Sequence, residues 1–524
     1  MNTPRLLPMH HRPALRLLPL TLAAMAVLAL AACGGGGGGD APPPSTPAIT
    51  DSTAYSTDPN ASLAVASEAK AVTQQRLVLA SGAIDYTATA GHLTANDVAS
   101  GTPQASFFYV AYTANGGNAS TRPVTFFYNG GPGSASLWLH LGSFGPKRLV
   151  TNMPSNQLVS SFALVDNTES LLDVSDLVFV DAVGTGQSQA IAPATNRSFW
   201  GVDADARVFR DFIARYMAVN GRGASPRVVF GESYGTLRSA ILAEELEASG
   251  VGVDGVVLLS SVLDYNSNCG VVDDRRYSCG GYLPSYAATG AYHQRVQPVP
   301  ADTAAFVLQA VSFADERYGP AVAAYIAGSA PPATLLADLA ALTGTTQTLW
   351  QSQFNLGPDT FRDNLLPGQL IGRYDARISG LTGGPLAADG DPSLTVIEAP
   401  FITATRDYLR QGLAYTSQAG YTSFSNAINF WQWAHDGKSL PDAVPDLAAA
   451  MTLNPRLRVL SLNGHHDLAT PFHQTVLDLR RLGPQPRITV QHIPGGHMTY
   501  LDDSARRQQR TVLADFYRSL RTAP

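Results

Sequence analysis

Three polar residues of this sequence each follow an apolar, strand-like stretch of chain. Ser233 lies in the Gly-Glu-Ser-Tyr-Gly motif at 231–235, and Asp467 and His497 follow two later stretches. A serine hydroxyl becomes a nucleophile when a histidine takes its proton, and a carboxylate fixes the tautomer of that histidine. The chain therefore carries candidates for a nucleophile, an orienting acid and a general base, in the order Ser, Asp, His.

The surroundings of Ser233 predict a sharp turn between a strand and a helix. Residues 227–230 (Arg-Val-Val-Phe) are apolar and β-branched, as in a buried parallel strand, and apolar residues recur at helical spacing from 237 to 246. A G-x-S-x-G motif on such a turn is the nucleophile elbow of the α/β hydrolases, where small residues let the turn expose the serine hydroxyl. The order Ser, Asp, His is also theirs.

The rest of the pattern predicts an α/β-hydrolase fold with a mostly parallel central sheet. Strand-like stretches alternate with helical ones before and after the elbow, which favours parallel strands joined by right-handed crossovers. Earlier stretches between 76 and 112 predict an antiparallel edge. Helical and loop-like sequence then occupies 266–450. We expect a hydrolase core formed by 61–265 and 451–524, with 266–450 as a large inserted helical cap.

A glycine-rich loop follows the strand-like stretch 123–128. It begins with Asn129, Gly130 and Gly131. Without Cβ atoms, the backbone N–H groups of such a loop can point into a site. In α/β hydrolases a loop in this place supplies one N–H of the oxyanion hole, and the residue after the nucleophile supplies the other. We expect the second of these to be the N–H group of Tyr234; the alternative for the loop is a plain tight turn.

The N-terminus has the pattern of an export signal followed by a tether. Arginines precede an apolar run of about 16 residues, shorter than the roughly 20 needed to span a membrane, so a transmembrane anchor is the weaker interpretation. The run ends in Leu-Ala-Ala-Cys33, which resembles the lipobox of bacterial lipoproteins. We expect residues 1–33 to be a lipoprotein signal with lipid on Cys33. Residues 34–60 are rich in glycine and proline and predict a disordered tether.

The other two cysteines predict a local disulfide. In an exported protein Cys269 and Cys279, close together in a polar loop, would pair, although two free thiols are the alternative. A metal site at His465, His466 and His473 is a weaker possibility, because Asp467 is the one acidic residue at ligand spacing. A phosphate-binding loop at Gly184 and Gly186 lacks the other residues of such a motif. We therefore expect no metal ion and no cofactor.

The net charge of −6 gives no basic surface, so nucleic acid is not an expected partner. Trp431 and Trp433 in the predicted cap could line a substrate pocket, although such residues more often belong to a core.

Taken together, these motifs are similar to those of the serine carboxypeptidase family. The Asn-Gly-Gly-Pro-Gly loop, a Val-Gly-Thr-Gly loop at 183–186, the Gly-Glu-Ser-Tyr-Gly elbow, the late Asp and the Gly-His-Met recur there in this order. The resemblance implies a peptide substrate, with Ser233, Asp467 and His497 as the triad and the N–H groups of Gly131 and Tyr234 as the oxyanion hole. It also implies that Asn129, Gly130 and Glu232 help to bind the C-terminal carboxylate of that substrate.

One position departs from the family pattern. In the family the counterpart of Glu232 shares a proton with a second glutamate, and the alignment places Ser143 where that glutamate belongs. Lys147 and Arg148 lie just beyond and could supply a positive partner for a carboxylate, although a solvated basic pair is the simpler interpretation.

We expect a lipid-anchored serine exopeptidase of the bacterial cell envelope with carboxypeptidase-like specificity. An aminopeptidase-type hydrolase and an esterase or acyltransferase are alternatives on the same scaffold. A catalytically dead surface-binding protein is a further one, which the intact Ser, Asp and His argue against.

Overall fold

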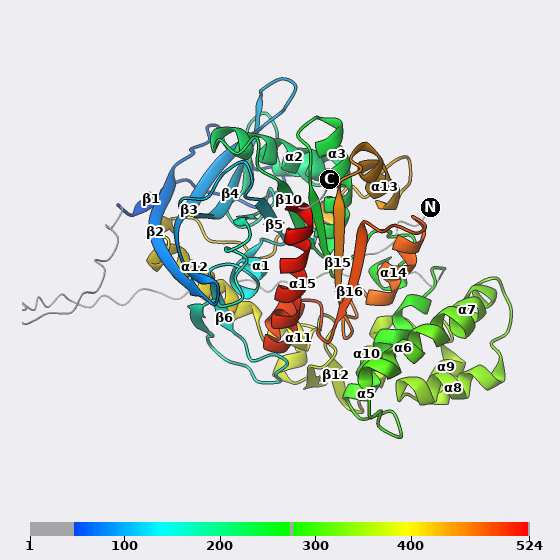
Figure 1. The fold of residues 1–524 in the computed structure, drawn as a ribbon. Coiled ribbons are helices and arrows are strands. Elements are labelled where there is room, and N and C mark those ends of the chain that lie inside the picture. Colours follow the sequence, from blue (N-terminus) through cyan, green and yellow to red (C-terminus); the bar gives the residue numbers. More distant parts are fainter. Residues whose placement is uncertain (1–46, 273–275, 522–524) are drawn as a thin grey trace, which may run out of the picture.

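The structure is a computed structural model that describes residues 47–272 and 276–521. The predicted signal segment 1–33, its Cys33 and the first part of the predicted tether lie outside these residues. Figure 1 shows the described chain as a large sheet with helices around it and a helical lobe at one end.

Within the described residues, ten strands form the central sheet. Its order is β16-β15-β11-β10-β5-β8-β4-β3-β2, with β9 beside β4. Neighbours from β16 to β8 are parallel, whereas β4, β3 and β2 continue as an antiparallel edge. This confirms the predicted α/β-hydrolase sheet. The strands are β2 (Lys70–Leu79), β3 (Gly82–Asn96), β4 (Pro103–Ala114), β5 (Val124–Tyr128), β8 (Asp176–Val180), β9 (Gln189–Ala190), β10 (Arg227–Glu232), β11 (Gly255–Leu259), β15 (Arg458–Gly464) and β16 (Ile488–Ile493).

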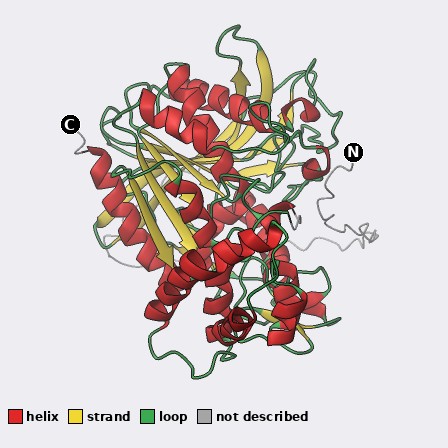
Figure 2. Cartoon of the chain, turned by 90° about the vertical axis from the view of Figure 1, so that its right-hand side faces the viewer, coloured by secondary structure: helices red, strands yellow, loops and turns green. Residues whose placement is uncertain are grey.

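Both faces of the sheet are buried, because side chains of a strand point alternately to opposite faces. Along β5, Phe126 and Tyr128 pack into one apolar cluster and Phe127 into the other. The first cluster is covered by α2, α3 and α13 and the second by α1, α12 and α15, so helices lie on both sides of the strands in Figure 2. These helices are α1 (Leu137–Gly142), α2 (Val202–Val219), α3 (Tyr234–Ala248), α12 (Glu398–Gln411), α13 (Val444–Leu453) and α15 (Asp503–Arg521).

The inserted lobe has an apolar core of its own, formed by side chains between Cys269 and Ala376 together with Leu468. Figure 1 shows it as the group of green helices beside α14 (Phe472–Arg480). Its elements are α4 (Cys269–Val272), η2 (Gly280–Tyr282), α5 (Leu283–Tyr292), α6 (Thr303–Phe313), η3 (Ala314–Tyr318), α7 (Gly319–Ile326), α8 (Ala333–Thr343), α9 (Gln347–Ser352), α10 (Pro358–Asn364) and β12 (Gln369–Ile371).

The prediction that all of 266–450 forms a cap is therefore wrong for its second half. Apolar side chains of α12 and α13 bury themselves against the two faces of the sheet rather than against the lobe. A helical pattern in the sequence does not say which surface the helix covers. The remaining elements are short: β6 (Lys147–Val150), β7 (Ala163–Asp166), η1 (Asn196–Phe199), β13 (Ser379–Leu381), η4 (Pro385–Ala387), α11 (Pro392–Thr395), β14 (Tyr415–Ser417), η5 (Ala427–Phe430) and η6 (Thr499–Leu501).

The end of the predicted tether is ordered, which corrects its boundary at residue 60. Strand β1 (Ile49–Asp51) pairs in parallel with β14. The buried carboxylate of Asp51 accepts hydrogen bonds from the Tyr55 and Tyr415 hydroxyls at 2.8 and 2.9 Å, and the Tyr55 ring stacks on His92. Within a stretch of tether-like composition, these few anchoring side chains are sufficient to fix the chain.

Candidate active site

Ser233 stands on a sharp turn between β10 and α3, as predicted. Its backbone has φ +62° and ψ −129°, a conformation that non-glycine residues rarely adopt and that is found at functional sites. Gly231 is required beside it, because a Cβ there would lie 2.1 Å from the carbonyl oxygen of Gly235. The Ser233 side chain is partly exposed at the carboxyl edge of the sheet.

Asp467 and His497 follow the adjacent strands β15 and β16, and the structure joins them directly. Nδ1 of His497 lies 2.7 Å from Oδ2 of Asp467, and both residues are buried. The other carboxylate oxygen accepts the N–H groups of Ala469 and Thr470 at 2.8 and 2.9 Å. Asp467 is thus held as an acceptor, so His497 donates from Nδ1 and keeps Nε2 free to take a proton.

The electrostatics of His497 suit a general base. Burial alone would lower the pKa of its imidazole, but the charge and hydrogen bond of Asp467 outweigh burial and raise the pKa above 6.5. The charge of Glu232 adds to this increase. Since a base must accept a proton readily but release it again, a pKa not far from neutrality is favourable.

Two residues that the sequence did not single out tie the loops of the site together. Ser260 follows β11, which lies between the elbow strand β10 and β15, and its hydroxyl donates to the carbonyl oxygen of His497 at 2.6 Å. Oγ1 of Thr470 lies 2.8 Å from both the Ser260 carbonyl oxygen and Oδ2 of Asp467. The N–H of Ser233 donates to Leu259, the last residue of β11. Ser233, Asp467 and His497 are therefore brought to one edge of the sheet.

The glycine-rich loop lies against the elbow. A Cβ on Gly130 would lie 2.5 Å from the backbone nitrogen of Tyr234, so the loop can come this close only with glycine. Gly131 has φ +105°, in the region that favours glycine. Tyr234 opens α3, where N–H groups lack partners within the helix. The predicted donors of Gly131 and Tyr234 thus belong to adjoining backbone segments next to Ser233.

Asn129 and Glu232 are buried side by side behind this loop. Nδ2 of Asn129 donates to Oε1 of Glu232 at 2.9 Å, and Oδ1 of Asn129 accepts the N–H of Leu139 in α1. Burial raises the pKa of Glu232 to about 7; Asp467 adds to the rise, and His497, Tyr500 and Asn129 partly offset it. The sequence brought Asn129 and Glu232 together only through the family resemblance, and the structure places them in contact.

Ser143 does not replace the missing glutamate. Its hydroxyl donates to the carbonyl oxygen of Leu139 within its own turn, at 2.5 Å. The group beside Glu232 is instead Tyr500, whose hydroxyl acts on the pKa of that carboxyl. Oε2 of Glu232 and the Tyr500 hydroxyl are both buried, and neither has a hydrogen-bond partner among the described residues. Tyr500 stands only three residues after His497, but a tyrosine gave no reason to single it out in the sequence.

Aromatic side chains form a wall next to the elbow. The Tyr234 ring lies edge-on to Trp431 and Trp433, with centroids 5.3 and 6.1 Å apart, and Tyr265 lies 5.0 Å from Trp433. The chain before Trp431 also contacts the glycine-rich loop, since the N–H of Ser425 donates to Gly133 at 2.8 Å. Trp431 is buried in the apolar cluster on this face of the sheet and the half-buried Trp433 packs against it, so both belong to the core, the role that such residues more often have.

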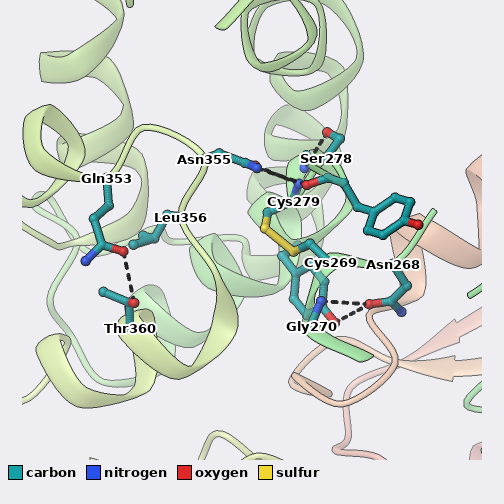
Figure 3. The surroundings of a disulfide bond; sticks show 12 residues. Asn268, Cys269, Gly270, Ser278, Cys279, Gln353, Asn355, Leu356 and Thr360 are labelled. Carbon is teal, nitrogen blue, oxygen red and sulfur yellow. Dashed lines mark hydrogen bonds between the residues drawn. A yellow bond between two sulfur atoms is a disulfide. The ribbon is translucent and has the colours of Figure 1, made fainter. Parts of the chain in front are cut away.

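The predicted disulfide between Cys269 and Cys279 is confirmed, with the two Cα atoms 5.3 Å apart. It lies at the base of the lobe, and Figure 3 shows the backbone N–H of Cys279 bonded to the side chain of Asn355 at 2.8 Å. The disulfide thus fixes the start of the lobe, in the chain that follows strand β11.

The histidines considered for a metal lie in different surroundings. His465 packs against Phe472, His466 against Tyr292, and His473 bonds to Asp315 at 2.9 Å. They do not converge on one point.

Among the described residues, the one group whose ligand atoms could hold a metal ion is His435, Asp436 and Asp446. Asp446 and Asp203 lie 3.1 and 2.6 Å from the two ring nitrogens of His435 and raise its pKa to about 9. A protonated imidazole between two carboxylates accounts for this arrangement without a metal.

Comparison with known proteins agrees with the resemblance seen in the motifs. A family model described as serine carboxypeptidase matches residues 80–266, which include the glycine-rich loop and the elbow but not Asp467 or His497. No curated protein sequence matches the chain significantly.

Among solved structures, Kex1Δp, a prohormone-processing carboxypeptidase from Saccharomyces cerevisiae, aligns with a TM-score of 0.52 at 13% identity. The alignment covers 82% of this chain and 91% of that chain. A proline iminopeptidase from Mycobacterium smegmatis aligns with a TM-score of 0.36 at 15% identity, over 83% and 99% of the two chains. The first likeness confirms the fold, and the second is too weak to support an argument.

Proposed function

We propose that this serine hydrolase, whose residues 80–266 match the serine carboxypeptidase family model, hydrolyses peptide bonds through an acyl-enzyme on Ser233. The observation that carries this proposal is the bonded pair Asp467–His497 at the same sheet edge as the strained Ser233. The family model does not reach that pair, so its geometry is independent support.

In this mechanism the hydroxyl of Ser233 attacks the scissile carbonyl carbon while His497 takes its proton at Nε2. Asp467 holds the ring and stabilises the imidazolium, and the N–H groups of Gly131 and Tyr234 bind the developing oxyanion. His497 returns the proton to the leaving amine. Water then attacks the acyl-enzyme in the same way, which releases the acid and restores the hydroxyl of Ser233.

We propose that the preferred substrates carry a free C-terminal carboxylate, bound near Asn129, Gly130 and Glu232. The test uses N-blocked dipeptides with a free or an amidated C-terminus, together with a simple ester. We expect the peptide with a free C-terminus to be cleaved at least about tenfold faster than the amide. The amidated peptide lacks the carboxylate that would bond to the groups near Asn129, Gly130 and Glu232. Equal rates would exclude a carboxypeptidase. Cleavage of unblocked peptides alone would indicate an aminopeptidase, and cleavage of esters alone an esterase.

Glu232 gives this proposal a pH dependence. Since its pKa is raised to about 7, the carboxyl is neutral below that pH and can donate to a substrate carboxylate, whereas above it the charged form repels one. His497 must be neutral to act, and its pKa lies above 6.5. We expect kcat/KM for free-carboxylate peptides to rise as His497 loses its proton and to fall as Glu232 ionises.

The variant Glu232→Gln separates the two limbs of that profile. The fall at high pH should disappear, and the rising limb should move to lower pH, because the charge of Glu232 then no longer raises the pKa of His497. Asp85→Asn, on the edge strand β3, removes an exposed carboxyl and serves as the control. Superimposable profiles for wild type and Glu232→Gln would rule out this role of Glu232.

We also propose that the protein is exported and anchored at the bacterial cell envelope by lipid on Cys33. The arginine-rich start, the apolar run and the lipobox-like end of residues 1–33 support this, as does the Cys269–Cys279 disulfide, since such bonds persist in oxidising compartments. In the described part of the chain, no helix has the length and apolar character to cross a bilayer. A labelled fatty acid should mark the full chain but not Cys33→Ala; label on both would refute the anchor.

A further inference from the structure

One segment of the lobe reaches across to the catalytic pair. Residues 372–377 follow β12, and their backbone bonds to both loops of the site: the N–H of Leu468 donates to the Arg373 carbonyl oxygen at 3.0 Å, and that of His497 to Tyr374 at 2.5 Å. The Tyr374 ring lies 5.0 Å from the His497 ring. Arg373 is therefore fixed between the loops that carry Asp467 and His497.

The guanidinium of Arg373 has few partners for a group so enclosed. Its Nη2 donates to the carbonyl oxygen of Gly270 at 3.2 Å, and its Nε is buried without any hydrogen-bond partner. Within the described residues, no carboxylate lies within ion-pair distance of it. By contrast, Arg238 is paired with Asp205, and Arg377 with Asp375 and Asp502.

Burial lowers the pKa of Arg373, but the charges of Tyr374, Asp359, Tyr282 and Asp391 outweigh burial and raise it, so the cation is stable although no described carboxylate forms an ion pair with it. What calls for an explanation is the buried Nε–H that has no acceptor in the described part of the chain. Arg373 is only partly buried, so a molecule arriving from solvent can reach it. The guanidinium of Arg373 is held by the carbonyl oxygen of Gly270. Gly270 follows Cys269, and the Cys269–Cys279 disulfide fixes this stretch of the lobe (Figure 3). The side chain is therefore anchored at one donor and leaves others available.

The charge of Arg373 acts on the catalytic base and on the aromatic wall. It opposes the rise in the pKa of His497. It also partly offsets the effect of burial, which raises the pKa of Tyr265 in the wall. Together with the backbone bonds that hold Arg373 between the loops of Asp467 and His497, the effect on the pKa of His497 indicates that the charge of Arg373 lies near the catalytic base.

The basic residues suggested by the sequence are engaged elsewhere. Lys147 forms an ion pair with Asp166, and Arg148 lies 3.8 and 3.6 Å from the carboxylates of Glu169 and Asp503. Ser143, in place of the second glutamate of the family, bonds within its own turn. None of these three groups supplies a free positive charge at the site.

We propose that Arg373 binds a carboxylate of the substrate through its guanidinium, whose Nε has no acceptor among the described residues. A guanidinium suits this role, since its planar N–H donors match the two oxygens of a carboxylate. The inference rests on the proposed peptidase function. The carboxylate can be the C-terminal one or an acidic side chain, and the two sources give different results below.

The experiment compares wild type with Arg373→Gln and Arg373→Lys on three kinds of substrate. Two N-blocked dipeptides differ only in Glu against Gln, and both have a free C-terminus; an N-blocked amino-acid ethyl ester has no carboxylate. If Arg373 binds the C-terminal carboxylate, Arg373→Gln should lower kcat/KM about 10- to 100-fold for both peptides, mainly through KM, and leave the ester within threefold. If it binds the side chain, the loss should be confined to the Glu peptide.

Arg373→Lys keeps the positive charge but not the planar pair of N–H donors of a guanidinium. Its kcat/KM should therefore lie between those of Arg373→Gln and wild type. Lys147→Ala, which removes a basic residue ion-paired with Asp166, is the matched control and should change none of the rates. An equal loss on all substrates would show a structural role and overturn the proposal, and so would no loss on any. The proposed function fails separately, if wild type cleaves free and amidated peptides at equal rates. If wild type prefers free carboxylates, and Arg373→Gln keeps both that preference and the wild-type rate on the Glu peptide, only this inference fails.

Discussion

Replacing Ser233 with alanine is expected to lower kcat for peptide hydrolysis by on the order of 10⁵–10⁶-fold, which is the usual cost of losing a nucleophile that acts as one unit with its base. The elbow should survive the change. Its backbone bonds, from the Ser233 N–H to Leu259 and from the N–H of Thr236 to Ser233, do not involve the hydroxyl. Rates are measured on the N-blocked free-carboxylate dipeptide used above.

The thermal midpoint of Ser233→Ala should stay close to that of wild type, so that loss of activity is not loss of fold. Substrate binding should also persist in the variant. The dissociation constant of an uncleaved peptide, measured directly on Ser233→Ala, should match the inhibition constant of that peptide against wild type. A variant that keeps more than about a hundredth of wild-type kcat would be incompatible with Ser233 as the nucleophile.

Asp467→Asn is expected to lower kcat by about 10⁴-fold while leaving the fold intact. Oδ1 of Asp467 accepts two backbone N–H groups, so the oxygen of the asparagine amide must take that place. Its NH₂ group then faces Nδ1 of His497 and Oγ1 of Thr470, where Oδ2 now lies. Thr470 can accept from it, since its hydroxyl can donate to the Ser260 carbonyl oxygen instead.

His497 cannot adjust without losing its function. With an amide donor at Nδ1, the ring must carry its proton on Nε2, and it can no longer take one from Ser233. The lost activity should return in part at alkaline pH, where the hydroxyl of Ser233 needs less help from a base. Equal pH profiles and equal kcat for Asp467→Asn and wild type would mean that Asp467 does not orient His497.

The predictable parts of this protein are those carried by local sequence. The Gly-Glu-Ser-Tyr-Gly elbow could be recognised because the turn itself demands glycine at 231, whatever lies around it. Asp467 and His497 could be found because each lies in the loop that follows a strand, and parallel strands bring their carboxyl ends to one edge. The antiparallel edge followed from short strand-like stretches between turns.

What could not be predicted depends on contacts between distant parts of the chain. Arg373 reaches the site only because residues 372–377 of the lobe bond to the loops after β15 and β16. Tyr500 meets Glu232 because Gly142 leaves space for its ring, 2.7 Å from where a Cβ would lie. The boundaries of the tether and the cap were wrong for a similar reason, since β1 is fixed by β14 and α12 by the sheet.

The most direct test of the account is to label the active enzyme with an organophosphonate that reacts with activated serine hydroxyls, and to locate the adduct by peptide mass spectrometry. We predict one adduct per chain, on the peptide that contains Ser233, formed in step with the loss of peptidase activity. Asp467→Asn should react far more slowly, because its His497 cannot take the proton. An adduct on another residue, or full activity in an enzyme labelled at Ser233, would contradict the account.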